Sequence, residues 1–250
     1  MRAMAHMGAP RLDSETWARK AASLARVIPA VLLLSMASPA SSQQPLPPNY
    51  KTVLDNADVL VQRVHYGPHE FIPPHDHYAV VTVLVYLNDS GVVELAHEPK
   101  PGDTEPDVVK RPPTHTGAFR IGPAAFERHS VRNLGDVPSD FFRVELKQLP
   151  LDWLKDQVRG PAPTPPLHDG VSTEYTDARL RIDRIICKAA TACSIDADPA
   201  PSVLITIPTP DELAKEPHLE RWVQPGEHVV ITTSRDHAQY LRILLLPAKP

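Results

Sequence analysis

Residues 71–87, FIPPHDHYAVVTVLVYL, place two histidines two positions apart, directly before a long apolar run. Successive side chains of an extended chain point to opposite faces, so His75 and His77 share one face and Asp76 takes the other. The apolar run has the length and character of a buried strand. The stretch therefore predicts a buried strand that opens with two aligned imidazoles.

Strand signals recur on both sides of this stretch, between Leu54 and Lys147. Residues 141–147 alternate most clearly, since every second side chain is apolar and those between are charged. Turn-forming clusters such as NDSG (88–91) separate the signals. Many short strands with frequent turns predict an all-β sandwich or barrel with few short helices. The predicted strand segments are 58–66, 78–87, 91–95, 117–121, 129–133 and 141–147.

The first forty residues have the three-part pattern of a secretory signal peptide. Five basic residues come first, the apolar run Val27–Ala37 follows, and small residues then predict cleavage after Ala40. The run is broken by Pro29 and is shorter than the roughly 20 apolar residues that span a bilayer, so no stable membrane span is expected after cleavage. An uncleaved anchor is the alternative. The mature protein is expected to be secreted or periplasmic.

Charge and cysteine content limit the partners. Without residues 1–40, which hold five basic and two acidic residues, the totals of 26 and 30 fall to 21 and 28, a net charge of −7. Basic residues nowhere cluster densely enough to bind the phosphates of a nucleic-acid backbone, so nucleic acid is not an expected partner. Cys187 and Cys193 could form a disulfide in an oxidising compartment or remain two buried thiols.

The second half of the chain repeats the first at a shift of 121 residues. Residues 56–66, NADVLVQRVHY, then lie on residues 177–187, DARLRIDRIIC, and Arg63 lies on Arg184. Agreement between the alternations of the two segments indicates a duplicated β unit. The predicted organisation is a signal peptide (1–40), a flexible lead-in (41–52), a β-barrel (53–150), a short helix with a Pro-rich linker (151–170) and a second β domain (171–250). Gly160 is expected to end that helix.

A metal site needs converging ligands, and two imidazoles on one strand cannot surround an ion. A third ligand should come from a strand that is distant in sequence but pairs nearby. His129, which opens a predicted strand after a Pro-containing turn, is the candidate. His75, His77 and His129 are therefore the predicted metal ligands.

These segments resemble the two motifs of the cupin family. The first motif is matched by Gly67, His75, His77 and Gly91. The second is matched by Gly117, Pro123, His129 and Asn133, with Ala125 in place of a glycine and one extra residue before the histidine. The resemblance covers residues 54–147 well and residues 175–248 loosely. It implies two double-stranded β-helix (jelly-roll) barrels in tandem, a bicupin.

The chain departs from the family pattern at the glutamate of the first motif. Val81 or Thr82 stands at the expected position, so the resemblance implies a site of three histidines alone. Such a site suits a divalent transition metal, Fe, Zn, Ni, Cu or Mn, better than Ca or Mg. It favours an anionic or chelating ligand that supplies the missing negative charge. Glu70 and Glu127 stay open as substitute ligands or acid–base groups.

The second repeat has lost the site. Asp196 and Asp198 fall where the first repeat has its histidine pair, and the later motif offers only His228 or His237. The aspartates are expected to be solvated turn residues rather than a hard-cation site. The other histidines, among them His97, are expected to face solvent, and His65 or His69 could orient a ligand ring.

The resemblance implies a metal-dependent enzyme, of the dioxygenase type, that acts on a small anionic molecule. A non-catalytic module that binds a metal or small ligand is the alternative, and a purely structural protein is a third. Arginines around the histidines, such as Arg120, Arg128 or Arg132, would favour an anionic substrate. No serine, phosphate-loop or Cys-x-x-Cys motif supplies other chemistry, and no catalytic residue is identified. Cupins often pair barrels, so pairing within one chain or as a homo-oligomer stays open.

Overall fold

The computed structural model describes residues 45–99, 102–216 and 218–248. In these residues the chain forms strands β1–β17 and one short helix, α1, which confirms the predicted all-β class. No helix among them is long and apolar enough to cross a membrane. The predicted signal peptide lies outside the described residues.

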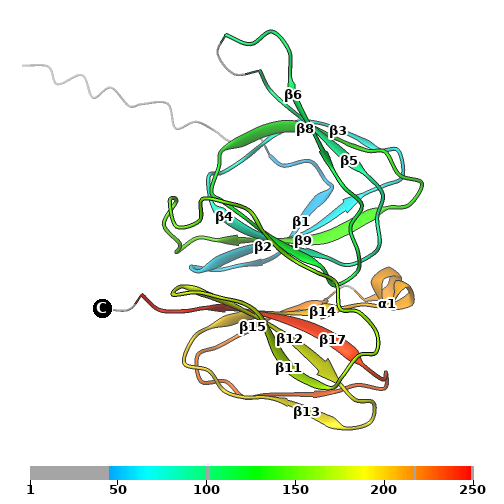
Figure 1. Ribbon diagram of the computed structural model, residues 1–250, viewed down its shortest axis with the longest axis vertical. Coiled ribbons are helices and arrows are strands. Elements are labelled where there is room, and N and C mark those ends of the chain that lie inside the picture. The colour runs from blue at the N-terminus through cyan, green and yellow to red at the C-terminus, as the bar shows by residue number, and fades with distance from the viewer. Residues whose placement is uncertain (1–44, 100–101, 217, 249–250) are drawn as a thin grey trace, which may run out of the picture. The chain divides into compact units, whose positions relative to one another are not determined.

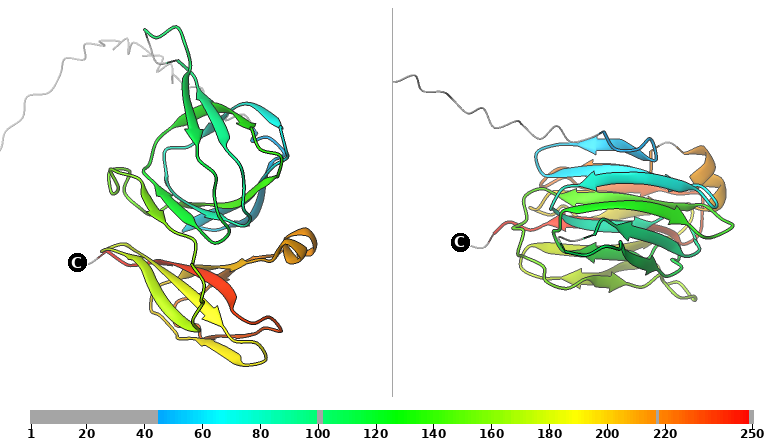
Figure 2. Two further views of the ribbon diagram at one scale, coloured as in Figure 1. Left: turned by 45° about the vertical axis from the view of Figure 1, so that its right-hand side comes forward. Right: turned by 90° about the horizontal axis from the view of Figure 1, so that it is seen from above.

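Strands β1–β10 form two antiparallel sheets that curl toward each other (Figure 1), and the left view of Figure 2 shows them as a nearly closed ring. The six-stranded sheet has the order β1 (Tyr50–Asp55), β2 (Val59–Tyr66), β9 (Ser139–Leu146), β4 (Val81–Tyr86), β7 (Phe119–Gly122) and β10 (Val158–Gly160). The four-stranded sheet has the order β3 (Phe71–His77), β8 (Glu127–Asn133), β5 (Val93–His97) and β6 (Asp107–Arg111).

Strands β11–β17 form a second, smaller pair of sheets. The five-stranded sheet has the order β11 (Gly170–Thr176), β12 (Leu180–Cys187), β17 (Ala238–Leu245), β14 (Ser202–Ile207) and β15 (Glu220–Val223). The two-stranded sheet pairs β13 (Ala192–Ile195) with β16 (Val229–Thr232). Helix α1 (Pro210–Lys215) begins at a capping box in which Thr209 and Glu212 satisfy each other's backbone N–H groups.

The shift of 121 residues found in the sequence also relates the strands. It carries the bounds of β2 onto those of β12 and those of β4 onto those of β14. The pairing of Tyr50 with Val64 has its counterpart in Val171 with Ile185, and the irregularity in β1 recurs in β11. These observations support a duplicated unit. That the chain is two cupin barrels in tandem, with the predicted domain bounds, stays a prediction.

The main core lies between the six-stranded and the five-stranded sheet. One cluster of buried apolar side chains joins both sheets and includes Val83 and Phe142 from the first and Ile182 and Leu241 from the second. The alternation of residues 141–147 explains how β9 contributes side chains to this core. Phe142, Val144 and Leu146 face this core. Arg143, on the opposite face of β9, lines the cavity inside the first sheet pair and binds Glu145.

Equivalent arginines of the two repeats cross to each other's sheet pair. Arg63 on β2 donates hydrogen bonds to the carbonyl oxygens of Leu213 and Glu216, at 2.8 and 3.0 Å. Arg184 on β12 is 2% exposed and donates to the carbonyl oxygens of Gly117 and Pro161. The duplicated sequence thus supplies the same type of contact in both directions.

The prediction of a helix over residues 151–160 is wrong. Residues 151–157 form turns and bends, and Trp153 and Leu154 pack against the core between the sheets. Gly160 does not end a helix but pairs in β10 with Phe119, whose ring lies where a side chain would stand, 1.9 Å from the position of a Cβ atom. The only described helix, α1, was not predicted.

Two further expectations are settled by the structure. The predicted lead-in ends early, because β1 begins at Tyr50, whose side chain is buried in the core of the first sheet pair. Cys187 and Cys193 form a disulfide, with Cα atoms 5.5 Å apart, so the open choice between a disulfide and free thiols is resolved in favour of the disulfide.

Candidate metal centre

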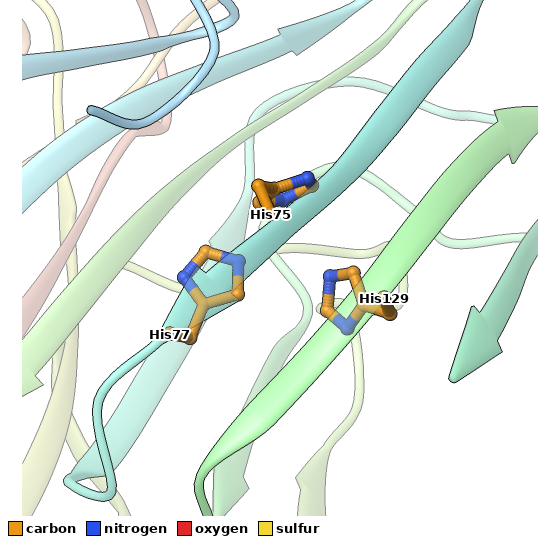
Figure 3. Close-up of side chains that lie close together, drawn as sticks. All are labelled: His75, His77 and His129. Atoms are coloured by element: carbon orange, nitrogen blue, oxygen red, sulfur yellow. The ribbon is translucent and has the colours of Figure 1, made fainter. Parts of the chain in front are cut away.

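The structure brings the three predicted ligands together (Figure 3). His75 and His77 project from β3, and His129 projects from β8, where it pairs directly with His75. One ring nitrogen from each residue lies within 4.8 Å of the others. All three side chains are buried, with 2–3% exposed. This is a compact donor set, and in the part of the chain that the structure describes no other group of this kind is found.

The local sequence explains why both histidines of β3 face inward. Pro73 and Pro74 can occupy this strand because β3 lies at the edge of its sheet, where a missing N–H costs least. The pairing with β8 shifts between Ile72 and His75, at the two prolines. Asp76 points outward, as alternation predicts, and accepts a hydrogen bond from Arg128 at 2.7 Å.

Burial keeps the three imidazoles neutral in the absence of a metal. It lowers the pKa of His129 to about 3, with the neighbouring His75 adding to the effect. Burial also lowers the pKa of His75 and that of His77, and the positive charge of Arg143 adds to both shifts. Neutral imidazole is the form that binds a metal ion.

The lowered pKa values make the stability of the metal-free protein depend on pH. Below about pH 6.5 the unfolded chain binds protons at these histidines that the folded chain does not, so stability is complete above that pH and is lost as the pH falls toward about 3. Three histidines give a slope of at most about 4 kcal/mol per pH unit. Urea unfolding of chelator-treated protein at pH 7.0 and 5.5 measures this change in the free energy of unfolding with pH. In the His77→Gln variant the slope should fall by about one third, and equal midpoints for the wild type at the two pH values would contradict the prediction.

A hydrogen-bonded pair of tyrosines contacts the histidines, which the sequence did not indicate. Nδ1 of His75 lies 2.9 Å from the carbonyl oxygen of Pro73, so it carries the proton and donates. Nε2 of His75 then accepts from the hydroxyl of Tyr50, also at 2.9 Å, and that hydroxyl lies 2.6 Å from the hydroxyl of Tyr66. An ion at Nε2 of His75 would have to displace the Tyr50 hydroxyl.

The donor atoms of the other two rings fit a metal ion. Nδ1 of His77 and Nδ1 of His129 are buried without a hydrogen-bond partner among the described residues. Buried polar atoms without a partner are uncommon, because each loses its hydration without compensation. Three neutral imidazoles, two of which have an unsatisfied nitrogen, form a donor set suited to Fe, Ni, Cu or Zn.

No carboxylate stands at the position of the family's glutamate. Thr82 lines a neighbouring cavity there, and its hydroxyl donates to the carbonyl oxygen of Val80. Glu145 pairs with Thr82 across the strands, but Arg143 binds its carboxylate at 3.0 Å. Glu127 lies 3.8 Å from Nδ1 of His129 and is 40% exposed, so it could act as a proton acceptor. Glu70, the other open candidate, caps the turn at Gly67 and contacts none of the three histidines.

Of the three arginines considered from the sequence, only Arg120 lines the cavity beside the histidines, together with Arg111 and Arg143. Arg128 faces outward and binds Asp76. Arg132 also faces outward, with its guanidinium 5.2 Å from the centre of the Phe71 ring. Arginines therefore line the cavity beside the histidines, but they come from β6, β7 and β9 rather than from β8.

His97 was expected to face solvent, and this was wrong. It is partly buried on β5, pairs directly with His129, and its ring centre lies 5.3 Å from that of His129. His65 and His69 do not orient a ligand ring, since they bind Asp140 and Asp136 instead.

Among its described residues, the second sheet pair holds no equivalent of this centre. Asp198 forms an ion pair with Arg181 at 2.7 Å, rather than being the solvated residue expected from the sequence. His228 binds the hydroxyl of Ser194, and His237 lies 3.2 Å from Asp169.

An all-β fold of antiparallel sheets, with three histidines converging inside one sheet pair, defines a cupin-like protein with a candidate metal centre. No protein-family model and no curated protein matches the chain. Solved structures similar to it include the bacterial pirin YhhW from Escherichia coli in complex with nickel(II), at 11% identity and a TM-score of 0.48 over 80% of this chain and 91% of that one.

Two further similar structures have lower scores. A salicylate 1,2-dioxygenase from Pseudaminobacter salicylatoxidans is 10% identical, with a TM-score of 0.44 over 78% of this chain and 75% of that one. A cupin domain from Bordetella pertussis Tohama I is 21% identical, with a TM-score of 0.32 over 42% of this chain and 98% of that one. The last of these is described as a cupin domain, the family whose two motifs the sequence resembles.

Proposed function

We propose that His75, His77 and His129 hold one divalent transition metal ion and that the protein is a metal-dependent enzyme, of the dioxygenase type, for a small anionic substrate. One observation carries the proposal: three buried, neutral imidazoles offer nitrogens within 4.8 Å of one another. The metal would supply Lewis-acid or redox chemistry. The chain's own contribution is to hold the ligand rings, exclude water and place positive charge beside the site.

Arg143 and the missing glutamate support an anionic substrate. A divalent ion held by three neutral ligands keeps its full charge, and Arg143 lies close enough to lower the pKa values of the histidines. The carboxylate of Glu145 offsets the charge of Arg143, to which it binds, and leaves the charge of the metal ion uncompensated. An anion that binds beside the metal would balance the remainder.

A second candidate function is metal or ligand binding without turnover. The free space beside His77 and His129 is about 40 Å³, enough for about one water molecule rather than a substrate. The described residues also place no buried, unengaged carboxylate beside the three histidines. Both observations favour a storage or binding role.

Export to the periplasm or the exterior remains part of the proposal. It rests on the first forty residues, and the Cys187–Cys193 disulfide supports an oxidising compartment. The mature chain would then meet its metal and its ligand outside the cytoplasm.

Elemental analysis of the purified protein tests the metal centre. We expect about one transition-metal ion per chain, because three converging imidazoles hold one ion. Redox-active iron, with oxygen consumed when small carboxylates are added, would support the enzyme. Zinc without turnover would support the binding function. A chain that stays free of metal after incubation with Fe(II), Ni(II) and Zn(II) would contradict both.

A further inference from the structure

A second, larger pocket lies at the edge of the six-stranded sheet. Its volume is about 700 Å³, which is within the range of pockets that hold small organic molecules. β7, the edge strand β10, the loop at 112–118 and the Pro-rich segment at 161–165 form its walls. The histidine cavity is far smaller, so this pocket is the better candidate for holding a whole ligand.

Three arginines line this pocket: Arg111, Arg120 and Arg159. Arg120 and Arg159 are direct partners in the pairing of β7 with β10. Like charges at directly opposed positions repel each other and destabilise a sheet. The arginine ion pairs among the described residues involve Arg128, Arg143, Arg181, Arg184, Arg221 and Arg235, and none of the three pocket arginines.

Two of these guanidinium groups also keep buried N–H groups without a partner. Arg111 is only 7% exposed, and it makes one side-chain hydrogen bond, from Nη2 to the hydroxyl of Ser139 at 2.7 Å. Nε of Arg111 and Nε of Arg120 are buried and unpartnered among the described residues. A buried cation without a counter-ion is costly, so an anion bound here would relieve the cost.

The single acid of the pocket does not neutralise the arginines. Asp89 accepts hydrogen bonds from the backbone N–H and the hydroxyl of Thr116, at 2.8 and 3.0 Å. These bonds, the backbone N–H above all, lower the pKa of Asp89 and keep its carboxylate engaged with the loop. The three arginines therefore have no acidic partner among the residues that line the pocket.

The remaining walls are largely apolar and rigid. Prolines line the pocket from both sides: Pro112, Pro113, Pro161, Pro163 and Pro165. Proline rings offer flat apolar surfaces and have little freedom to lose when a ligand binds. Such walls favour a flat apolar body attached to the anionic group.

We propose that this pocket binds a small organic monocarboxylate with a flat apolar body, whose carboxylate is held by Arg111, Arg120 and Arg159. Arg111 and Arg120 also line the histidine cavity, so the bound carboxylate lies at the boundary between the two spaces. That this anion is the substrate rests on the proposed function. Its binding in the pocket does not.

Calorimetric titration with benzoate, and with benzamide as its neutral counterpart, tests the proposal on the full mature chain. The wild type should bind benzoate at least 10-fold more tightly than benzamide, since only the carboxylate pairs with the guanidinium groups. Arg159→Gln should weaken benzoate binding at least 10-fold. Arg132→Gln, which changes an arginine outside the pocket, is the matched control and should bind benzoate as the wild type does.

Three outcomes would overturn the proposal: no benzoate binding at millimolar concentration, equal binding of benzamide, or unchanged binding in Arg159→Gln. Metal content measured on the same samples separates this proposal from the proposed function. If benzoate binding depends on Arg159 but the chain binds no metal, the pocket proposal is supported and the proposed metal centre is wrong. If the chain binds metal but not benzoate, the metal centre is supported and the pocket proposal is wrong.

Discussion

Nickel(II) added to the metal-free wild type should raise its melting temperature by about 5–10 °C, whereas the His129→Ala variant should show no such rise. A ligand that binds only the folded state at 100 times its dissociation constant stabilises it by about 2.7 kcal/mol. In a chain of this length each kcal/mol raises the melting temperature by about 2–4 °C. The folded state alone brings the imidazoles of β3 and β8 together, so the whole effect depends on the native pairing of His75 with His129.

Two histidine variants serve as controls for that result. His218→Ala removes an exposed imidazole whose side chain is 80% accessible, and it should keep the full rise in melting temperature. His97→Ala removes a ring that contacts His129 but is not one of the three converging ligands, so most of the rise should remain. A full rise in His129→Ala would mean that nickel binds elsewhere, and the proposed centre would be wrong.

The ligand set could be predicted because it depends on local alternation and on one long-range pairing. Alternation alone places His75 and His77 on one face of an extended strand, and β3 has this geometry. Alternation does not say which distant strand lies beside them. The position of His129, at the start of a predicted strand after a Pro-containing turn, made it the candidate, and the second cupin motif matched the same residue. The structure pairs that residue directly with His75.

The surroundings of the histidines could not be predicted, because they depend on which face of each strand closes around the interior. Residues 141–147 show two faces in the sequence, but not that the charged face would turn inward. It does so because the apolar face, with Phe142, is buried against the second sheet pair. Arg128 and Arg132 lie beside His129 in sequence, yet alternation turns them to the outside.

The errors in local structure have a related cause. The pattern of residues 151–160 is compatible with a helix, but Trp153 and Leu154 pack instead against the shared core. Helix α1 is only six residues long and has no buried residues, so no apolar periodicity marks it. Tyr50 is a single aromatic residue after a Pro-rich stretch, and its burial against Tyr66 depends on the pairing of β1 with β2.

The Phe142→Ala variant should lose about 3–5 kcal/mol of its free energy of unfolding, the usual cost of removing a fully buried phenylalanine side chain. Phe142 is fully buried, and its cluster includes Ile182 and Leu241 of the second sheet pair. Because the cavity opens between the two sheets, both should lose stability together. Urea unfolding measures the loss, and hydrogen exchange should show faster exchange in β12 and β17 as well as in β4 and β9.

Phe126→Ala is the matched control, since the same atoms are removed from a side chain that is 64% exposed. It should change the free energy of unfolding by no more than about 0.5 kcal/mol. Faster exchange confined to β4 and β9 in Phe142→Ala would contradict a shared core, because the second sheet pair would then hold its strands without the first. Exchange that rises in all four strands would show that the apolar face of β9 stabilises both halves, leaving its charged face free to line the histidine cavity.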